Sequence, residues 1–269
     1  MNRKVFLNGK ILALDKAKAS ILAPGFLYGF GLFETMRSRK GRIIYLDQHI
    51  QRIQKSSQLI GIKFIYREDR LKEIIKQVVK LNGFQDSYVK LVLWKAQAGT
   101  TVFVTAKEYK PYPEKRYTLG FRACISDFRQ NETFLAQIKT TNRILYQLSL
   151  EQAKEKGFDE AIILNQHGYI TEGTRCNIFF VKNKEVFTPA LACGCLDGIT
   201  RKAIFNLANG KIIEGNFTIR DLLQADEAFL TNSLMGVMLL VSMEGKVIGK
   251  GRRGRITKWF IEKYSCLLK

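Results

Sequence analysis

The chain has 269 residues, of which 46% are apolar, and its 44 Lys and Arg residues outnumber its 24 Asp and Glu residues to give a formal charge of +20. This length suffices for a large hydrophobic core in one or two domains. Because no run of about 18 apolar residues occurs, we expect no membrane-spanning helix. The segment 1–9 lacks the apolar stretch and small-residue cleavage site of a signal peptide, so we expect a cytoplasmic protein.

The positive charge is spread along the whole chain instead of forming one block. Its densest short run, 249–255, has no interleaved aromatic side chains for stacking on bases and predicts a solvated loop. We therefore expect no nucleic-acid partner, and a basic nucleic-acid-binding protein is the alternative from a different class. The net charge would favour small anionic substrates.

Cysteine usage gives no sign of a disulfide framework or a metal site. The five cysteines are widely spread and include no C-x-x-C pair. Cys193 and Cys195 are too close for an easy disulfide and lack a second metal-binding pair. We expect free thiols in a reducing compartment and no bound metal.

The first part of the chain combines short strands with two amphipathic helices. Segment 5–11 places an Asn-Gly turn between two apolar stretches, which predicts a β-hairpin. Segment 24–37 begins as irregular backbone rich in Pro and Gly and becomes a strand from about Leu32 to Arg39. Asp47 is the predicted N-cap of a helix. The other predicted elements here are strands at 43–45, 88–94 and 101–106 and helices at 47–59 and 67–81.

Segment 109–116 has two prolines and four charged residues and is the best candidate for a linker. We therefore predict a small domain at 1–110, a linker at 111–118 and a large domain at 119–269. Strands and helices in both halves, with many hairpins, predict two α+β domains. The predicted elements of the second half are strands at 119–125, 160–164, 169–171, 177–181, 185–188, 227–231 and 238–242 and helices at 142–156, 200–208, 219–223 and 256–268.

Three features between 137 and 200 could together hold a pyridoxal phosphate. Lys139 has an amine that can form a Schiff base with the cofactor aldehyde. Glu172 has a carboxylate that can pair with the pyridinium nitrogen. The turn Gly198-Ile199-Thr200 can offer backbone N–H groups and a hydroxyl to the phosphate. Lys95, which follows an apolar strand, is the rival to Lys139 on sequence alone.

The segments 137–143, 168–180 and 196–201, in this order, resemble the motifs of the class IV aminotransferases, the fold-type IV pyridoxal-phosphate family. The resemblance extends over nearly the whole chain. It implies pyridoxal 5'-phosphate as cofactor and a two-domain α+β fold like that of D-amino-acid aminotransferase, with a small N-terminal and a larger β-rich C-terminal domain. It also implies a homodimer with each active site between the two domains.

The resemblance assigns a role to individual residues. Lys139 stands where the family has its Schiff-base lysine, and Glu172 stands where the family has the glutamate facing the pyridine nitrogen. Arg52 matches the arginine that grips the cofactor phosphate, and its fork suits bidentate binding. The remaining expected phosphate ligands are Gly198, Ile199, Thr200 and Ser233.

Within the family, the sequence Lys139-Thr-Thr-Asn142-Arg143 resembles the Lys-x-x-Asn-Arg motif of aminodeoxychorismate lyases, as does segment 225–238. Thr35 matches a threonine thought to assist proton transfer in those lyases. The resemblance therefore predicts a lyase of folate biosynthesis, which cleaves 4-amino-4-deoxychorismate to 4-aminobenzoate and pyruvate. Lys139 and Thr35 are its expected catalytic residues.

The alternative within the same family is an aminotransferase for branched-chain or D-amino acids, which would use the same Lys139 and Glu172. Either substrate carries carboxylate groups, so cations should lie nearby. Arg37, Arg143 and Arg175 are the candidates, and the sequence does not rank them.

Overall fold

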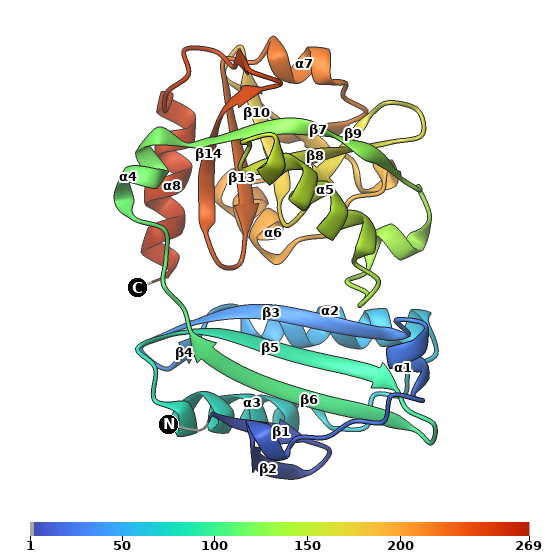
Figure 1. Cartoon of the computed structure of the whole chain (residues 1–269). Coiled ribbons are helices and arrows are strands. Elements are labelled where there is room, and N and C mark those ends of the chain that lie inside the picture. The colour runs from blue at the N-terminus through green and yellow to red at the C-terminus, as the bar shows by residue number, and fades with distance from the viewer. Residues whose placement is uncertain (1–2, 269) are drawn as a thin grey trace. The chain divides into compact units, whose positions relative to one another are not determined.

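The computed structural model describes residues 3–268 and divides the chain into two compact units (Figure 1). The first unit combines the chain up to Lys110 with a short later segment, Ile138–Asn142. The second unit comprises Pro111–Gln137 and everything from Arg143 onward. Both units mix helices with a large sheet, so the predicted α+β class is confirmed.

The first unit is built on a six-stranded sheet in the order β2-β1-β6-β5-β3-β4 whose neighbours are all antiparallel. The hairpin predicted at its start is confirmed, because Asn8 and Gly9 both have positive φ and form the tight turn between β1 and β2. The strands are β1 (Lys4–Leu7), β2 (Lys10–Ala13), β3 (Gly31–Arg39), β4 (Arg42–Ile43), β5 (Asp86–Lys95) and β6 (Thr100–Glu108).

Two amphipathic helices, α2 (Leu46–Leu59) and α3 (Glu68–Asn82), cover one face of this sheet and lie behind it in Figure 1. Their apolar residues, such as Ile50 and Ile74, recur at helical spacing and are fully buried against the sheet. In β5, buried and partly exposed residues alternate, as expected for a strand with one covered face. Two short elements complete the unit, η1 (Leu14–Lys16) and α1 (Pro24–Leu27).

The predicted N-cap of α2 is wrong by two positions. The cap residue is Tyr45, which has a left-handed backbone, and Asp47 lies inside the first turn. There the carboxylate of Asp47 forms an ion pair with Lys72 of α3, whose Nζ lies 2.6 Å from Oδ1. A carboxylate in the first turn still suits the helix dipole, so the sequence signal is genuine although the boundary is shifted.

The second unit contains a mixed nine-stranded sheet in the order β12-β11-β10-β13-β14-β7-β8-β9, with β15 paired to β14. The predicted hairpin at 177–188 is confirmed, with Asn183 and Lys184 at its turn. The strands are β7 (Phe121–Gln130), β8 (Glu160–Asn165), β9 (Ile170–Gly173), β10 (Asn177–Lys182), β11 (Glu185–Pro189), β12 (Ile212–Gly215), β13 (Glu227–Asn232), β14 (Gly236–Met243) and β15 (Lys246–Val247).

An aromatic stack links the sheet of the second unit to its last helix. The rings of Phe179 and Phe229 are parallel at 5.1 Å, and Phe260 of α8 lies 5.3 Å from Phe229.

No helix in residues 3–268 has the length and apolar character needed to cross a bilayer. The helices of this unit are α4 (Glu114–Leu119), η2 (Phe134–Gln137), α5 (Ile144–Glu155), η3 (Leu191–Cys193), α6 (Ile199–Leu207), α7 (Ile219–Leu223) and α8 (Arg255–Leu267).

The division of the chain differs from the predicted domain boundaries in two places. Segment 111–118, predicted as a linker, belongs to the second unit and contains most of α4. Segment 138–142, predicted within the large domain, belongs to the first unit. Its backbone explains this, because Phe33 N–H donates to the carbonyl of Lys139 and Thr141 N–H donates to the carbonyl of Gly31, both at 2.9 Å.

Replacing Phe229 with Ala should destabilise the protein by about 3–5 kcal/mol, because the ring is fully buried and its loss leaves a cavity between Phe179 and Phe260. Urea unfolding followed by circular dichroism measures this change. The matched control is Phe134→Ala, whose ring is 52% exposed and whose removal should change stability by less than about 1 kcal/mol. Equal effects of the two changes would contradict the packing described.

Candidate active site

Lys139 lies beside β3 of the first unit, directly after the buried Ile138. Its Nζ is 4.9 Å from the centre of the Phe33 ring, and the Nζ of Lys90 is 4.5 Å from the same centre. Two ammonium groups therefore share one aromatic ring, which attracts cations. The rival Lys95 lies at the exposed end of β5, with its Nζ 5.6 Å from the Phe30 ring.

Side chains alternate between the two faces along β3, and this determines which predicted residues lie on the same face as the Lys139 side chain. Phe33, Thr35 and Arg37 point to the face opposite the helices, and Thr35 is paired across the sheet with Lys90. Arg37 donates to the carboxylate of Asp86 at 2.7 Å. The guanidinium of Arg37 also lies 5.0 Å from the centre of the Tyr109 ring. The first unit thus places Thr35 and Lys139 on one face, and it engages Arg37 within its own sheet.

On the helix side of β3, Glu34 forms a buried cluster with two residues of α2. The Nε of Arg52 donates to Glu34 Oε1 at 2.8 Å, and its Nη2 donates to Glu34 Oε2 at 2.6 Å. The Nδ1 of His49 lies 2.6 Å from Glu34 Oε2. The guanidinium predicted to bind the cofactor phosphate therefore makes a bidentate pair with Glu34, and its binding to phosphate stays a prediction.

The charges of this cluster follow from its burial. Burial by itself would raise the pKa of Glu34, but the charge of Arg52 and the hydrogen bonds from His49 and Arg52 lower it to about 2. Burial lowers the pKa of His49, and this outweighs the opposing effect of Glu34. At neutral pH the carboxylate is therefore ionised and the imidazole neutral, so His49 donates its Nδ1–H to Glu34.

In the second unit, Glu172 of β9 is a buried carboxylate with both oxygens engaged. Its Oε1 accepts the phenol hydrogen of Tyr146 at 3.1 Å, and its Oε2 accepts the N–H of Leu196 at 3.1 Å. Burial and the neighbouring Glu172 raise the pKa of Tyr146, so the phenol keeps its hydrogen. The two donors fix the position of the carboxylate and favour its ionised form.

The predicted phosphate turn opens helix α6, and Gly198 is its N-cap with no side-chain cap. A Cβ on Gly198 would lie 2.0 Å from the Asn177 side-chain oxygen, so any other residue there would displace the Asn177 amide. Asn177 in turn donates to the carbonyl of Leu196 at 2.8 Å, which links the turn to the segment that holds Glu172. The hydroxyl of Thr200 lies 3.3 Å from the phenol of Tyr264. First-turn N–H groups without a cap suit an anion such as phosphate.

Ser233 lies in the turn between β13 and β14, which Asn232 shapes by accepting the N–H groups of Leu234 and Met235. The amide of Asn232 also donates to the carbonyl of Arg175 at 3.1 Å. The Nε of Arg175 is 3.8 Å from the buried carboxylate of Glu160, and the side chain is half exposed. The structure therefore brings the Ser233 turn and the Arg175 loop together.

Arg143, the third candidate for binding a substrate carboxylate, has its guanidinium over the ring of Tyr146. Its guanidinium carbon is 3.3 Å from the centre of that ring, and its Nη2 donates to the carbonyl of Thr174 at 2.7 Å. Sequence reasoning did not single out Tyr146. The sequence does show a tyrosine on the helix that follows Lys139. It does not show the contact of this tyrosine with Glu172, because that contact depends on how β9 packs.

The structure thus distributes the predicted residues over both units. Lys139, Thr35, Arg37 and Arg52 belong to the first unit, with Glu34 and His49 as the unpredicted neighbours. The second unit holds Glu172, the phosphate turn, Ser233, Arg143 and Arg175. In residues 3–268 no group of three or more His, Cys, Asp or Glu side chains is arranged to hold a metal ion.

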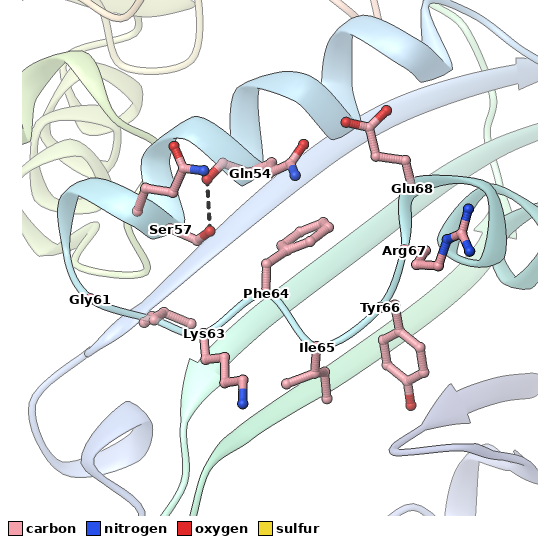
Figure 2. A pocket seen from close by; sticks show the side chains of 11 residues that line it. Gln54, Ser57, Gly61, Lys63, Phe64, Ile65, Tyr66, Arg67 and Glu68 are labelled. Carbon is pink, nitrogen blue, oxygen red and sulfur yellow. Dashed lines mark hydrogen bonds between the residues drawn. The ribbon is translucent and has the colours of Figure 1, made fainter.

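A cavity of about 610 Å³ lies in the first unit, where the end of α2 leads into the start of α3. Figure 2 shows its lining, which includes Phe64 and Tyr66 on the connecting loop and Arg67 before α3. None of the predicted site residues lines it. We therefore separate this cavity from the candidate active site.

The family profile described as amino-transferase class IV matches residues 31–242. A putative branched-chain-amino-acid aminotransferase of Methanocaldococcus jannaschii is 30% identical over 97% of this chain and 95% of its own length. The D-alanine aminotransferase of Bacillus licheniformis is 33% identical over 95% of this chain and 93% of its own. Pyridoxal phosphate is the cofactor typical of this family.

Solved structures confirm the predicted two-domain fold of type IV. The branched-chain aminotransferase of Escherichia coli superposes with a TM-score of 0.94 at 24% identity, over 100% of this chain and 95% of that one. The branched-chain aminotransferase of Thermoproteus uzoniensis with norvaline gives 0.91 at 29%, over 99% and 95%. A putative 4-amino-4-deoxychorismate lyase from Legionella pneumophila gives 0.86 at 23%, over 94% and 96%.

Replacing Glu34 with Gln should destabilise the protein by about 3 kcal/mol at neutral pH, which corresponds to a pKa lowered from 4.5 to about 2. Ionised Glu34 stabilises the fold fully above pH 4.5, and this contribution is lost as the pH falls toward 2. The difference between wild type and variant should therefore shrink over that window. Urea unfolding at about pH 7 and about pH 3 measures it.

The control for this experiment is Glu73→Gln, which breaks the exposed pair of Arg70 and Glu73 in the same unit. Exposed pairs contribute little, so this change should cost less than about 1 kcal/mol at either pH. A Glu34→Gln penalty that stays constant from neutral to acid pH would contradict the ionised, buried pair.

Proposed function

The chain belongs to the class IV aminotransferase family, and we propose that it is a pyridoxal-phosphate-dependent aminotransferase that exchanges an amino group between an amino acid and a 2-oxo acid. The observation that carries the proposal is the buried Glu172 carboxylate, held by Tyr146 and the Leu196 N–H. A fixed anion of this kind is what a protonated pyridine ring needs opposite its nitrogen. The two aminotransferase relatives, similar over at least 95% of this chain, support it.

For the substrate we propose branched-chain amino acids, with D-alanine as the competing choice. The first choice is supported by the relative from M. jannaschii and the second by the one from B. licheniformis. The charge of +20 favours anionic partners such as 2-oxo acids. Lys90 and Lys139 add local positive charge on the face of the first sheet opposite the helices.

The residues present fit the cofactor. The uncapped start of α6, with Gly198 and Thr200, suits its phosphate, and we propose Ser233 and Arg52 as further phosphate ligands. Glu172 suits its ring nitrogen, and Lys139 suits its aldehyde. When bound, pyridoxal phosphate supplies an aldehyde that condenses with amines and a ring that accepts the electron pair of a carbanion.

Individual side chains of the protein would then have separate roles in the reaction. Lys139 would hold the cofactor at rest and, once displaced by the substrate amine, would take the proton from the carbon that bears this amine. Glu172 would keep a proton on the ring nitrogen. The Phe33 ring, whose centre is 4.9 Å from the Lys139 Nζ, would limit where that amine can move. Arg143 and Arg175 lie in the second unit as candidates for the substrate carboxylate.

We further propose a homodimer, as the family resemblance implies. Large apolar side chains at 21–28 support this, because their exposure of 51–71% is unusual for a surface. These side chains are Ile21, Leu22, Phe26, Leu27 and Tyr28.

A second candidate function is the aminodeoxychorismate lyase, which would release 4-aminobenzoate and pyruvate without a 2-oxo acid. It is favoured by the run Lys139-Thr-Thr-Asn142-Arg143 and by Thr35, which lies on the same strand face as Phe33. Thr35 would then share the proton transfer with Lys139. The similarity to the Legionella structure bears on the fold alone.

One assay separates these functions. Purified protein with cofactor is given leucine or D-alanine with 2-oxoglutarate, and separately 4-amino-4-deoxychorismate with no 2-oxo acid. We expect glutamate from one of the amino acids over many turnovers. Sustained release of 4-aminobenzoate and pyruvate instead, with no amino-acid turnover, would replace the aminotransferase by the lyase.

Replacing Lys139 with Ala should lower activity by at least about 100-fold, since it removes both the covalent attachment and the proton carrier. Borohydride reduction followed by mass spectrometry should find the cofactor on wild type and not on this variant. The matched control is Lys95→Ala, which should keep both attachment and activity. A cofactor attached to Lys95 would contradict the assignment.

A further inference from the structure

Glu172 is one end of a hydrogen-bond chain within the second unit. The amide of Gln130, at the end of β7, donates to the phenol oxygen of Tyr146 at 2.8 Å. The phenol in turn lies 3.1 Å from Glu172 Oε1. Because the Gln130 nitrogen can only donate and an ionised carboxylate can only accept, the phenol hydrogen must point at Glu172.

Tyr146 is also held rigidly. Its ring is buried and covered by the Arg143 guanidinium, whose carbon is 3.3 Å from the ring centre. Arg143 is itself anchored by its bond to the carbonyl of Thr174, two residues after Glu172. The phenol therefore has one orientation available, and α5 and the loop after β9 are joined through it.

We infer that Tyr146 is a positioning residue that keeps Glu172 ionised and aims it at the cofactor ring nitrogen. The inference rests on the proposed role of Glu172. A hydrogen bond donated to a carboxylate favours its charged form. Without that donor, Glu172 becomes more basic, and the proton it shares with the ring nitrogen moves toward the carboxylate. The ring then loses part of its capacity to accept electrons.

The chemistry also identifies which form of Tyr146 acts. Burial and the adjacent Glu172 raise its pKa, so the phenol stays protonated throughout the range in which enzymes work. A residue that keeps its hydrogen serves as a constant donor and does not itself exchange protons during turnover. Its effect is therefore on the electrostatics of Glu172.

The test is Tyr146→Phe, which removes the hydroxyl and keeps the ring under Arg143. Wild type and variant are loaded with pyridoxal phosphate labelled with ¹⁵N in the ring, and the ¹⁵N chemical shift is followed against pH. In wild type the ring nitrogen should be protonated. In the variant the proton should pass from the ring nitrogen to Glu172 and not to solvent, so the ¹⁵N shift should move toward that of the unprotonated ring at every pH, with the ratio of the two forms changed about tenfold.

Three further variants make the outcome decisive. Gln130→Met leaves Tyr146 in place but removes the amide that donates to its phenol oxygen. A smaller change of the ¹⁵N shift in the same direction is therefore expected, and this test stands even if Tyr146→Phe folds poorly. Tyr117→Phe removes a phenol bonded to the Met235 carbonyl in the same unit and should leave the signal unchanged. Glu172→Gln should abolish ring protonation.

The outcomes separate the inference from its premise. If Glu172→Gln lowers ring protonation while Tyr146→Phe and Gln130→Met match wild type, the positioning role of Tyr146 is wrong and the role of Glu172 stands. If the wild-type ring nitrogen is unprotonated, or Glu172→Gln leaves it protonated, the proposed role of Glu172 fails and the inference fails with it.

Discussion

The return of the chain at 138–142 to the first unit is the constraint on which the arrangement of the site residues depends. Two backbone hydrogen bonds, from Phe33 N–H to Lys139 and from Thr141 N–H to Gly31, hold this segment beside β3. These bonds pair backbone groups of this segment with β3, so the position of the Lys139 backbone is set by the first sheet. Lys139 is thereby attached to the first sheet, although the residues on either side of its segment belong to the second unit.

Burying an anion is costly unless donors surround it, and each unit solves this problem differently. Glu34 is matched by a full positive charge on Arg52, so that cluster is neutral at neutral pH. Glu172 is held by a phenol and a backbone N–H. The partners of Glu34 suit a permanent ion pair, and the neutral donors of Glu172 suit the proposed pairing of its carboxylate with a cationic ring.

Much of the fold was readable from local patterns. The Asn8-Gly9 hairpin, helices α2, α3 and α6, and the 177–188 hairpin depend on residues close in sequence, and each lies where it was predicted to within a few positions. The cap predicted at Asp47 is wrong because the helix begins at Leu46, after the left-handed Tyr45, and Asp47 in its first turn pairs with Lys72 of another helix. Likewise, segment 138–142 was predicted in the large domain because nothing local shows that its backbone pairs with β3.

The sequence by itself determined the residue types and their order: a lysine, a later glutamate and a Gly-Ile-Thr turn that opens a helix, and with them the family and its cofactor. It could do so because those motifs are short and the helix start is a local structure. Only the tertiary structure decided that Arg52 pairs with Glu34, that Arg143 covers Tyr146, and that Tyr146 donates to Glu172. These contacts join residues 18, 3 and 26 positions apart. The two long-range contacts depend on which strand faces which helix. The periodicity of a single segment does not encode that pairing.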